Sequence, residues 1–209
     1  MTEINNFEII KSLINTNGDD EFYMLQIIHR SKDGLTQFDN GENGNFSKKL
    51  IKTYFIYSTE YLERKMDEIT TMCKTYNARA YINLNKKSNK QVSLKALAIL
   101  ANGISREDYS CIKSLFETAC GQVGACDGNK LWIVDIDTKD AIMLNTIKHI
   151  VNECEIEKFK DSTIVATIPT LNGFHLITRP FDKGEFKKRI GTNIDVHDNN
   201  PTLLYYYKN

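Results

Sequence analysis

The chain has 209 residues, of which 41% are hydrophobic and 26% charged, with 27 basic residues, 27 acidic residues and only 3 prolines. These values are typical of a folded protein with a sizeable core, and they exclude a largely disordered chain and a uniformly basic nucleic-acid-binding protein. No apolar stretch approaches the roughly 20 residues of a membrane helix and the first residues lack signal-peptide features, so we expect a cytoplasmic protein with no membrane partner.

Any nucleic-acid contact must come from locally segregated basic residues. A run of like charges usually forms a solvated face, which is the simpler interpretation of each cluster taken alone. The clusters are Lys48, Lys49 and Lys52; Lys86, Lys87 and Lys90; and Lys183, Lys187, Lys188 and Arg189.

The cysteines are odd in number and widely spaced, at positions 73, 111, 120, 126 and 154. This distribution fits reduced thiols better than a disulfide framework. Cys120 and Cys126 are the closest pair, but a five-residue gap with no second pair and no nearby histidine is poor spacing for zinc. The cysteine pattern therefore does not favour a structural zinc site.

The first part of the chain predicts strands around one amphipathic helix. Residues 21–30 and 52–58 are rich in aromatic and β-branched side chains and predict two strands, while the Gly- and Asn-rich residues 39–45 predict a loop. Ser58 or Thr59 can cap the helix that follows, and residues 78–84 return as a strand. Apolar residues recur on one face of that helix: Leu62, Met66, Ile69 and Cys73.

Residues 88–119 have a helical pattern, which we interpret as an insert or cap. Gly103 separates two apolar stripes, and residues 120–129 carry three glycines and predict a loop. The first stripe contains Leu94, Leu97, Ala98 and Ala101, and the second contains Ile112, Leu115, Phe116 and Ala119.

The last part predicts a strand at 131–137, a helix capped by Thr138, and a strand at 162–168, which together form a βαβ unit or a split version of one. Asn172-Gly173 is a strong hairpin signal because both residues tolerate positive φ, so residues 174–180 are expected to run back antiparallel. Residues 202–207 supply a last, aromatic strand. The helix has one apolar side: Met143, Ile147, Ile150 and Val151.

These elements predict an α+β fold with a mixed, mainly antiparallel sheet and flanking helices. We expect a single domain over residues 1–209. It would contain an N-terminal α/β part at 1–87, a helical insert and loop at 88–129, and a part at 130–209 that carries the residues best suited to chemistry.

Two acids end the strand Trp132-Ile133-Val134-Asp135-Ile136-Asp137. Period-two alternation places Asp135 and Asp137 on the same face. Two carboxylates side by side repel each other unless a cation lies between them, and hard oxygen ligands at this spacing suit Mg²⁺ or Mn²⁺. The simpler alternative is that one acid begins the turn and the other helps to cap the helix.

The strand after the hairpin carries a histidine and an arginine. Gly173 lets a ligand approach the backbone, and alternation puts His175 and Arg179 on a common face. An arginine fork and a histidine that can become positively charged fit contact with a polyphosphate. The alternative is an ordinary hairpin whose histidine bonds a neighbour.

A third acid lies near the end of the chain, in Asn193-Ile194-Asp195-Val196-His197-Asp198. An acid flanked by apolar residues can complete a metal site, and Asp195 is preferred over Asp198. Turn chemistry is the competing explanation for the Asp198-Asn199-Asn200-Pro201 stretch.

The order of these signals resembles the three catalytic motifs of the archaeo-eukaryotic primase family, including small primase-polymerase relatives of viral and plasmid type. The resemblance covers roughly residues 131–205. It implies a primase/RRM-like core in which Asp135, Asp137 and Asp195 bind Mg²⁺ or Mn²⁺ and His175 contacts the phosphates of the incoming nucleotide. The family usually has a small residue, often serine, where this chain has Gly173.

The resemblance implies two-metal nucleotidyl transfer, with nucleoside triphosphates and a single-stranded nucleic-acid template as partners and a replicative helicase as a further partner. His175, Arg179 and Asn172 would hold the triphosphate. The template would lie along Arg79 and the lysines at 86–90, with bases stacked on exposed residues among 205–207.

Two alternatives stay open at this point. Paired acids with Lys139 nearby also suit a metal-dependent nuclease. A non-catalytic, primase-like protein that binds nucleic acid or nucleotide is the other alternative.

Overall fold

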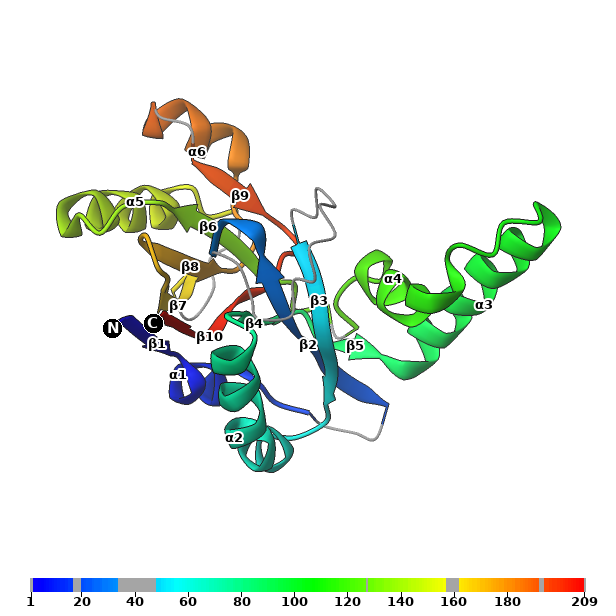
Figure 1. Ribbon diagram of the computed structural model, residues 1–209. Helices are drawn as coiled ribbons and strands as arrows, with labels where there is room; N and C mark the ends of the chain where they lie inside the picture. Colours follow the sequence, from blue (N-terminus) through cyan, green and yellow to red (C-terminus); the bar gives the residue numbers. More distant parts are fainter. Residues whose placement is uncertain are drawn as a thin grey trace.

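The computed structural model describes residues 2–16, 20–33, 48–126, 128–156, 162–191 and 194–208. Over these residues the chain forms two antiparallel sheets and six α-helices, so the expected α+β class with mainly antiparallel strands is confirmed (Figure 1). The helices are α1 (Phe7–Leu13), α2 (Thr59–Thr75), α3 (Asn89–Ser105), α4 (Leu115–Gln122), α5 (Ala141–Glu153) and α6 (Lys183–Ile190). The strands are β1 (Thr2–Asn5), β2 (Glu21–Arg30), β3 (Lys48–Ile56), β4 (Arg79–Ile82), β5 (Lys87–Ser88), β6 (Trp132–Ile136), β7 (Ile164–Pro169), β8 (Phe174–Thr178), β9 (Asp195–His197) and β10 (Thr202–Lys208).

The first sheet has the strand order β1-β10-β4-β2-β3, and β5 pairs with β2. The strands predicted at 21–30, 52–58 and 78–84 correspond to β2, β3 and β4. The loop predicted at 39–45 lies outside the described residues. Alternate residues of β2 face opposite sides, so Leu25 and Ile27 enter the main core while Ile28 and Arg30 point to the other face.

Helix α2 covers one face of the first sheet. As predicted, Ser58 caps it, because the Ser58 hydroxyl accepts a hydrogen bond of 3.1 Å from the Tyr61 amide. Leu62, Ile69 and Cys73 of the predicted stripe are fully buried against this face.

The second sheet has the order β7-β8-β6-β9. Because β8 is antiparallel to both β6 and β7, these two strands are parallel with β8 between them, which is the split form of the βαβ unit. The cap of α5 is Asp140 rather than Thr138: the Asp140 carboxylate accepts from the Ile142 amide at 2.9 Å. Thr138 instead accepts from the Asp140 amide.

The predicted hairpin is β7–β8, closed by a hydrogen bond of 2.9 Å from the Thr170 amide to the Gly173 carbonyl. Positive φ, the reason given for expecting it, does not occur at Asn172 or Gly173. Among the described residues, positive φ is confined to Asn77, Glu107, Gly128 and Gly191.

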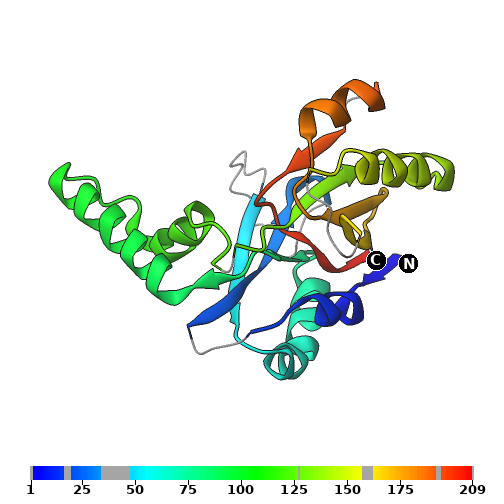
Figure 2. The same cartoon turned by 180° about the vertical axis from the view of Figure 1, so that it is seen from behind.

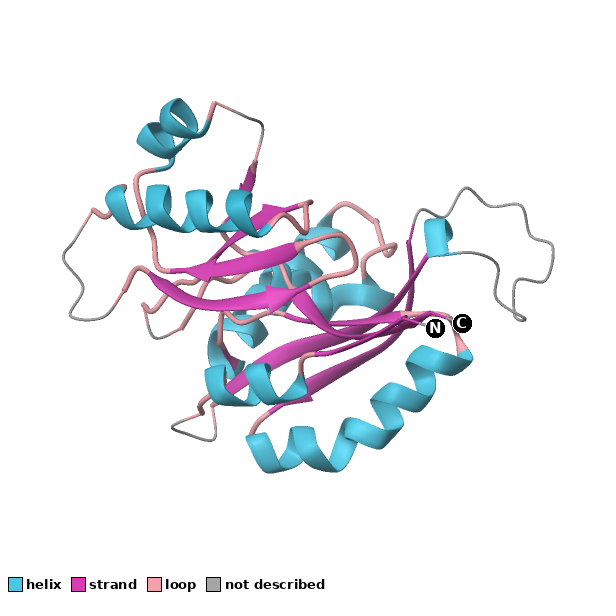
Figure 3. Cartoon of the chain, turned by 90° about the vertical axis from the view of Figure 1, so that its left-hand side faces the viewer, coloured by secondary structure: helices cyan, strands magenta, loops and turns pink. Residues whose placement is uncertain are grey.

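The two sheets face each other, with helices on their outer sides (Figure 3). Helices α5 and α6 cover the outer face of the second sheet, and α1 and α2 that of the first. Ile133, Ile168 and Ile177 of the second sheet belong to the same apolar cluster as Leu25 and Ile27 of the first, so the main core spans both sheets.

Helices α3 and α4 form an arm that projects from one side of the molecule (Figures 1 and 2). The helical prediction for this segment is correct, and α4 extends into the predicted loop as far as Gln122. Leu115, Phe116 and Ala119 of the second stripe pack inward, whereas Leu94 and Leu97 of the first stripe are exposed.

Five helices and strands were not predicted: β1, α1, β5, α6 and β9. Helix α6 contains the basic cluster that begins at Lys183, and Phe186 is its only fully buried side chain. Within the described residues, no helix is long and apolar enough to span a bilayer.

Candidate functional site

Three of the predicted site residues lie in one row across the second sheet. Asp135 on β6 is paired with His175 on β8 and with Asp195 on β9. Residues directly opposite each other in an antiparallel sheet project from the same face. Asp135, His175 and Asp195, separated by up to 60 residues in sequence, therefore share the sheet face that lies away from α5.

His175 lies between an acid and a hydroxyl. Its Nε2 is 3.5 Å from Asp135 Oδ1, and its Nδ1 is 2.9 Å from the hydroxyl oxygen of Thr202. A carboxylate only accepts hydrogen bonds, so the favoured neutral tautomer carries its proton on Nε2 and accepts from Thr202 at Nδ1.

Burial lowers the pKa of His175 below its ordinary value, and His197 adds to this effect. The Asp135 and Asp137 carboxylates act in the opposite direction. His175 is therefore neutral at neutral pH, and a bound anionic phosphate would favour its protonated form.

A cavity of about 360 Å³ lies between the two sheets beside this row. The second sheet contributes Asp135, Asp137, His175 and His197. Asn172 from the β7–β8 turn lines the same cavity, as expected for a residue near His175. This wall is rich in carboxylate and imidazole groups.

The opposite wall is basic. Arg30 of β2, Lys48 of β3 and Arg79 of β4 line it together with Tyr81. The Arg30 guanidinium donates to the Tyr81 hydroxyl at 3.2 Å. Arg79 is buried and its guanidinium donates two hydrogen bonds to the Asp33 carboxylate, which fixes its position. Carboxylates and cations thus face each other across the cavity.

The third acid borders an adjoining cavity of about 240 Å³. Asp135, Asp137 and Asp195 all line it, at the end of β6 where the chain turns into α5. Asp137 lies one residue beyond the strand and is exposed, like Asp195. Among the described residues, no group of three or more His, Cys, Asp or Glu side chains is arranged to hold a metal ion.

Gly173 is required for packing of the chain itself. A Cβ atom at this position would lie 1.9 Å from the Ile136 carbonyl oxygen and 2.7 Å from the Thr138 amide nitrogen. From the sequence, this glycine was expected to let a ligand approach the backbone. The group that approaches closely is instead the β6–α5 connection, which carries Asp137.

Arg179 does not line the same cavity as His175. Strand β8 ends at Thr178, and the Arg179 guanidinium donates to the Ser162 carbonyl oxygen. Arg179 lines a separate cavity of about 620 Å³ together with Pro180. His175 and Arg179 thus lie towards opposite ends of β8, beside different cavities.

The lysines that were expected to bind the template do not form an exposed basic surface. Lys86 is buried and forms an ion pair of 2.9 Å with Glu21. Lys87 is fully buried, and of the three only Lys90 is exposed. Tyr205 and Tyr206 are fully buried in the first sheet, so neither is available for base stacking.

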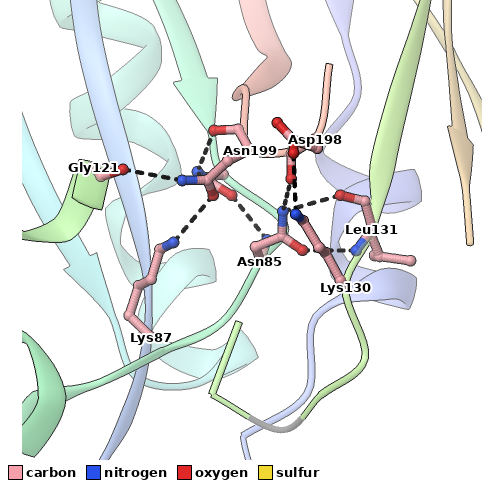
Figure 4. Close-up of polar contacts among 8 residues, drawn as sticks. Asn85, Lys87, Gly121, Lys130, Leu131, Asp198 and Asn199 are labelled. Atoms are coloured by element: carbon pink, nitrogen blue, oxygen red, sulfur yellow. Dashed lines mark hydrogen bonds and ion pairs between the residues drawn. The ribbon is translucent and has the colours of Figure 1, made fainter. Parts of the chain in front are cut away.

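A polar network holds the loop between β9 and β10 (Figure 4). The Asn199 side chain donates to the Gly121 carbonyl of the arm at 3.1 Å and accepts from Lys87 Nζ at 3.1 Å. Asn83 donates to the Asn199 carbonyl at 3.1 Å. The loop that joins Asp195 to Thr202 is thereby tied to the arm and to the end of β4.

A second part of the network fixes the entry to β6 (Figure 4). The Asn85 side chain donates to the carbonyls of Leu131 and Asp198, at 3.0 and 3.3 Å, and accepts from the Leu131 amide at 2.7 Å. Asp198 also pairs with Lys130 at 3.1 Å. Asp198 therefore has a structural partner, while Asp195 lies in the cross-strand row.

Several residues of the site were not predicted. His197 could have been found, because the alternation Asp195-Val196-His197 places both polar side chains on one face. Arg30 is the last residue of the strand predicted at 21–30, so alternation indicated its face less strongly. Thr202 gives no local signal, since its role depends on how β10 and β8 meet.

A comparison of the chain with protein-family models, curated proteins and solved structures finds no match.

Proposed function

We propose that this chain is a divalent-metal-dependent nucleotidyltransferase of the primase-polymerase type, which extends nucleic acid or makes primers on a template. The observation that carries the proposal is the row of Asp135, His175 and Asp195 on three neighbouring strands. Asp135 and His175 line a cavity whose other wall is basic, and Asp195 borders the adjoining one. Acids on one side and cations on the other suit a nucleotide triphosphate held between metal ligands and phosphate-binding groups.

We infer that residues 132–197 form an RRM-like unit. The supporting observation is the element order β6-α5-β7-β8-α6-β9, combined with the sheet order β7-β8-β6-β9. Both are the orders expected of a split βαβ fold with two helices on one face. The site residues project from the face that these helices leave uncovered.

The donor set fits Mg²⁺ or Mn²⁺, because Asp135, Asp137 and Asp195 supply only carboxylate oxygens and all border one small cavity. These three residues would hold the ion. A bound divalent ion would neutralise charge on phosphate oxygens and lower the pKa of an attacking hydroxyl.

The protein's own groups would do the positioning. His175 would donate from Nε2 to a phosphate oxygen, and Thr202 would hold the ring in the required orientation. Arg30 and Lys48, from the opposite wall, would contact the remaining phosphate charge. Arg179 has no part in this mechanism, because it lines a different cavity.

The test is primer extension on a labelled single-stranded template with Mn²⁺ or Mg²⁺ and either ribo- or deoxyribonucleotides. We expect longer products with the wild-type chain and their loss in Asp135→Asn and Asp195→Asn. Asp67→Asn is a matched control, since Asp67 is an exposed acid on α2. Extension that survives in Asp135→Asn contradicts the proposal.

The same assay separates the alternatives. Shortened labelled strands would indicate a nuclease that uses the paired acids with Lys139 nearby. Metal-dependent nucleotide binding without any product, lost in an Asp135→Ala, Asp137→Ala double variant, would indicate a non-catalytic binding protein. Either result replaces the nucleotidyltransferase proposal.

A further inference from the structure

The cavity that Arg179 lines lies between the two sheets, towards the other ends of β6 and β8. It has a volume of about 620 Å³, and Leu131, Val165 and Tyr23 line it together with Arg179. Arg179 follows His175 by four residues, which is roughly 13 Å along an extended chain. The Arg179 cavity is therefore separate from the cavity beside His175, and its volume suits a small organic ligand.

Three cations from separate segments line the Arg179 cavity: Lys86, Lys130 and Arg179. None of the described residues in its lining is an acid. Glu21, which pairs with Lys86, and Asp198, which pairs with Lys130, are not part of the lining. A ligand that enters the cavity therefore meets the cations rather than these two acids, which favours an anion.

Lys86 is held in place within the cavity wall. It is only 4% exposed, and its ammonium group pairs with Glu21 at 2.9 Å and donates to the Asn15 side-chain oxygen at 3.4 Å. The Tyr23 hydroxyl in turn donates to the Asn15 carbonyl at 2.9 Å and accepts from the Asn15 amide at 3.1 Å. A cation that is already fixed can attract an anion without the cost of ordering a mobile side chain on binding.

Lys130 and Arg179 can contact an anion while they keep their present partners. The Lys130 ammonium lies 3.1 Å from the Asp198 carboxylate (Figure 4), its side chain is 41% exposed, and an ammonium group has three N–H donors. The Arg179 guanidinium donates to the Ser162 carbonyl oxygen. A guanidinium has five N–H donors in a planar fork that matches the oxygens of a phosphate.

The rest of the lining is apolar, with two amides. Leu84, Leu131 and Val165 supply apolar surface, and Asn15 and Asn129 supply side-chain amides. A flat base can pack against the apolar side chains, and an amide carries both a donor and an acceptor, as the edge of a base does. The lining thus combines groups for a phosphate with groups for a base.

We propose that the Arg179 cavity is a second nucleotide site, which binds a free nucleoside phosphate with its phosphates on Lys130 and Arg179 and its base beside Leu131 and Val165. A carboxylate ligand offers two oxygens, whereas a chain of phosphates offers enough oxygens for all three cations. The site includes none of the three acids proposed to hold metal and uses no divalent ion. It therefore does not rest on the nucleotidyltransferase activity.

Isothermal titration calorimetry of the full chain in EDTA tests the proposal, with the four common nucleoside triphosphates titrated one at a time. We expect one molecule of at least one of them to bind per chain, and its nucleoside and inorganic pyrophosphate to bind at least about tenfold more weakly. Lys130→Ala and Arg179→Ala should each lower the affinity about tenfold, because each removes charge-assisted hydrogen bonds.

Two control variants should bind as the wild type does. Lys188→Ala is the matched lysine control, since the Lys188 side chain is 79% exposed on α6. Arg30→Ala removes a cation from the cavity beside His175, and so separates the two cavities. Far-ultraviolet circular dichroism confirms that each variant is folded.

Several results would overturn the proposal. One is that no nucleotide binds, and another is that pyrophosphate binds as tightly as the nucleotide, because the base would then contribute nothing. Affinity that falls in Arg30→Ala but not in Lys130→Ala would assign binding to the other cavity. A 5′-phosphorylated oligonucleotide that binds more tightly than the mononucleotide would overturn the assignment to a free nucleotide. None of these results depends on whether the chain extends a primer.

Discussion

Lys87 gives a prediction whose magnitude follows from the structure. Its ammonium group is fully buried and donates to the Val123 carbonyl oxygen and to Asn199 Oδ1. Burial lowers the pKa of Lys87 from 10.5 to about 8. Because each pKa unit corresponds to 1.36 kcal/mol, the charged ammonium costs roughly 3 kcal/mol of folding stability at most.

The direction of the pH dependence follows from the number of protons that the folded and unfolded states bind. The folded-state pKa of Lys87 lies below the unfolded-state value, so its neutral form contributes stability that is complete above pH 10.5 and is lost as the pH falls through about 8. Lys87→Met removes this titration. We therefore expect the free energy of unfolding of the wild type, relative to Lys87→Met, to rise by about 2 kcal/mol between pH 8 and pH 10.

Urea unfolding followed by fluorescence of Trp132, the single tryptophan, measures this difference. Other titrating groups are common to the two proteins and cancel in the comparison. At pH 7 the variant gains from the removed charge and loses two hydrogen bonds, so the absolute difference there is small. A difference that stays constant from pH 7 to pH 10 would refute the reasoning.

Three further predictions concern the site. Gly173→Ala should lower the free energy of unfolding by about 3 kcal/mol, because its Cβ would meet backbone atoms. The control is Gly121→Ala in the same urea experiment. This variant should be neutral or stabilising, because Gly121 lies in a helix with open space around it. Asp135→Asn should lower the pKa of His175 further, as read from imidazole proton shifts; an unchanged pKa contradicts the assigned contact. Thr202→Val should alter the ¹⁵N shift of His175 Nδ1 and cost about 1–2 kcal/mol in stability, and an unaltered shift would exclude the hydrogen bond.

The parts of the fold that were predicted depend on local pattern. Helix α2 followed from its cap at Ser58 and its apolar spacing, and strand β2 from its β-branched and aromatic residues. The resemblance of the motif order to the primase family implied that Asp135, His175 and Asp195 belong together. The hydrogen-bonding register of the sheet then determines that these three residues stand opposite one another.

The parts that were missed depend on tertiary contacts. Strand β9 has only three residues and forms by pairing with β6, so its alternation is too short to predict a strand by itself. In the sequence Lys86 and Lys87 resemble a surface charge run, because their partners Glu21 and Asn199 are remote in sequence. Arg179 was grouped with His175 because alternation gives the face of a side chain but not the cavity that it lines along the strand.

The position of β10 constrains the order in which the molecule can fold. This strand lies between β1 and β4, so that Glu3 pairs with Tyr207 across about 200 residues of chain. During synthesis β1 has no strand to join until β10 has left the ribosome, and pairing over such a separation is slow. Since β10 also carries Thr202, the orientation of His175 would be fixed only in this final step. A nascent chain that stalls before residue 202 would expose the edge of β4 and would lack an ordered imidazole.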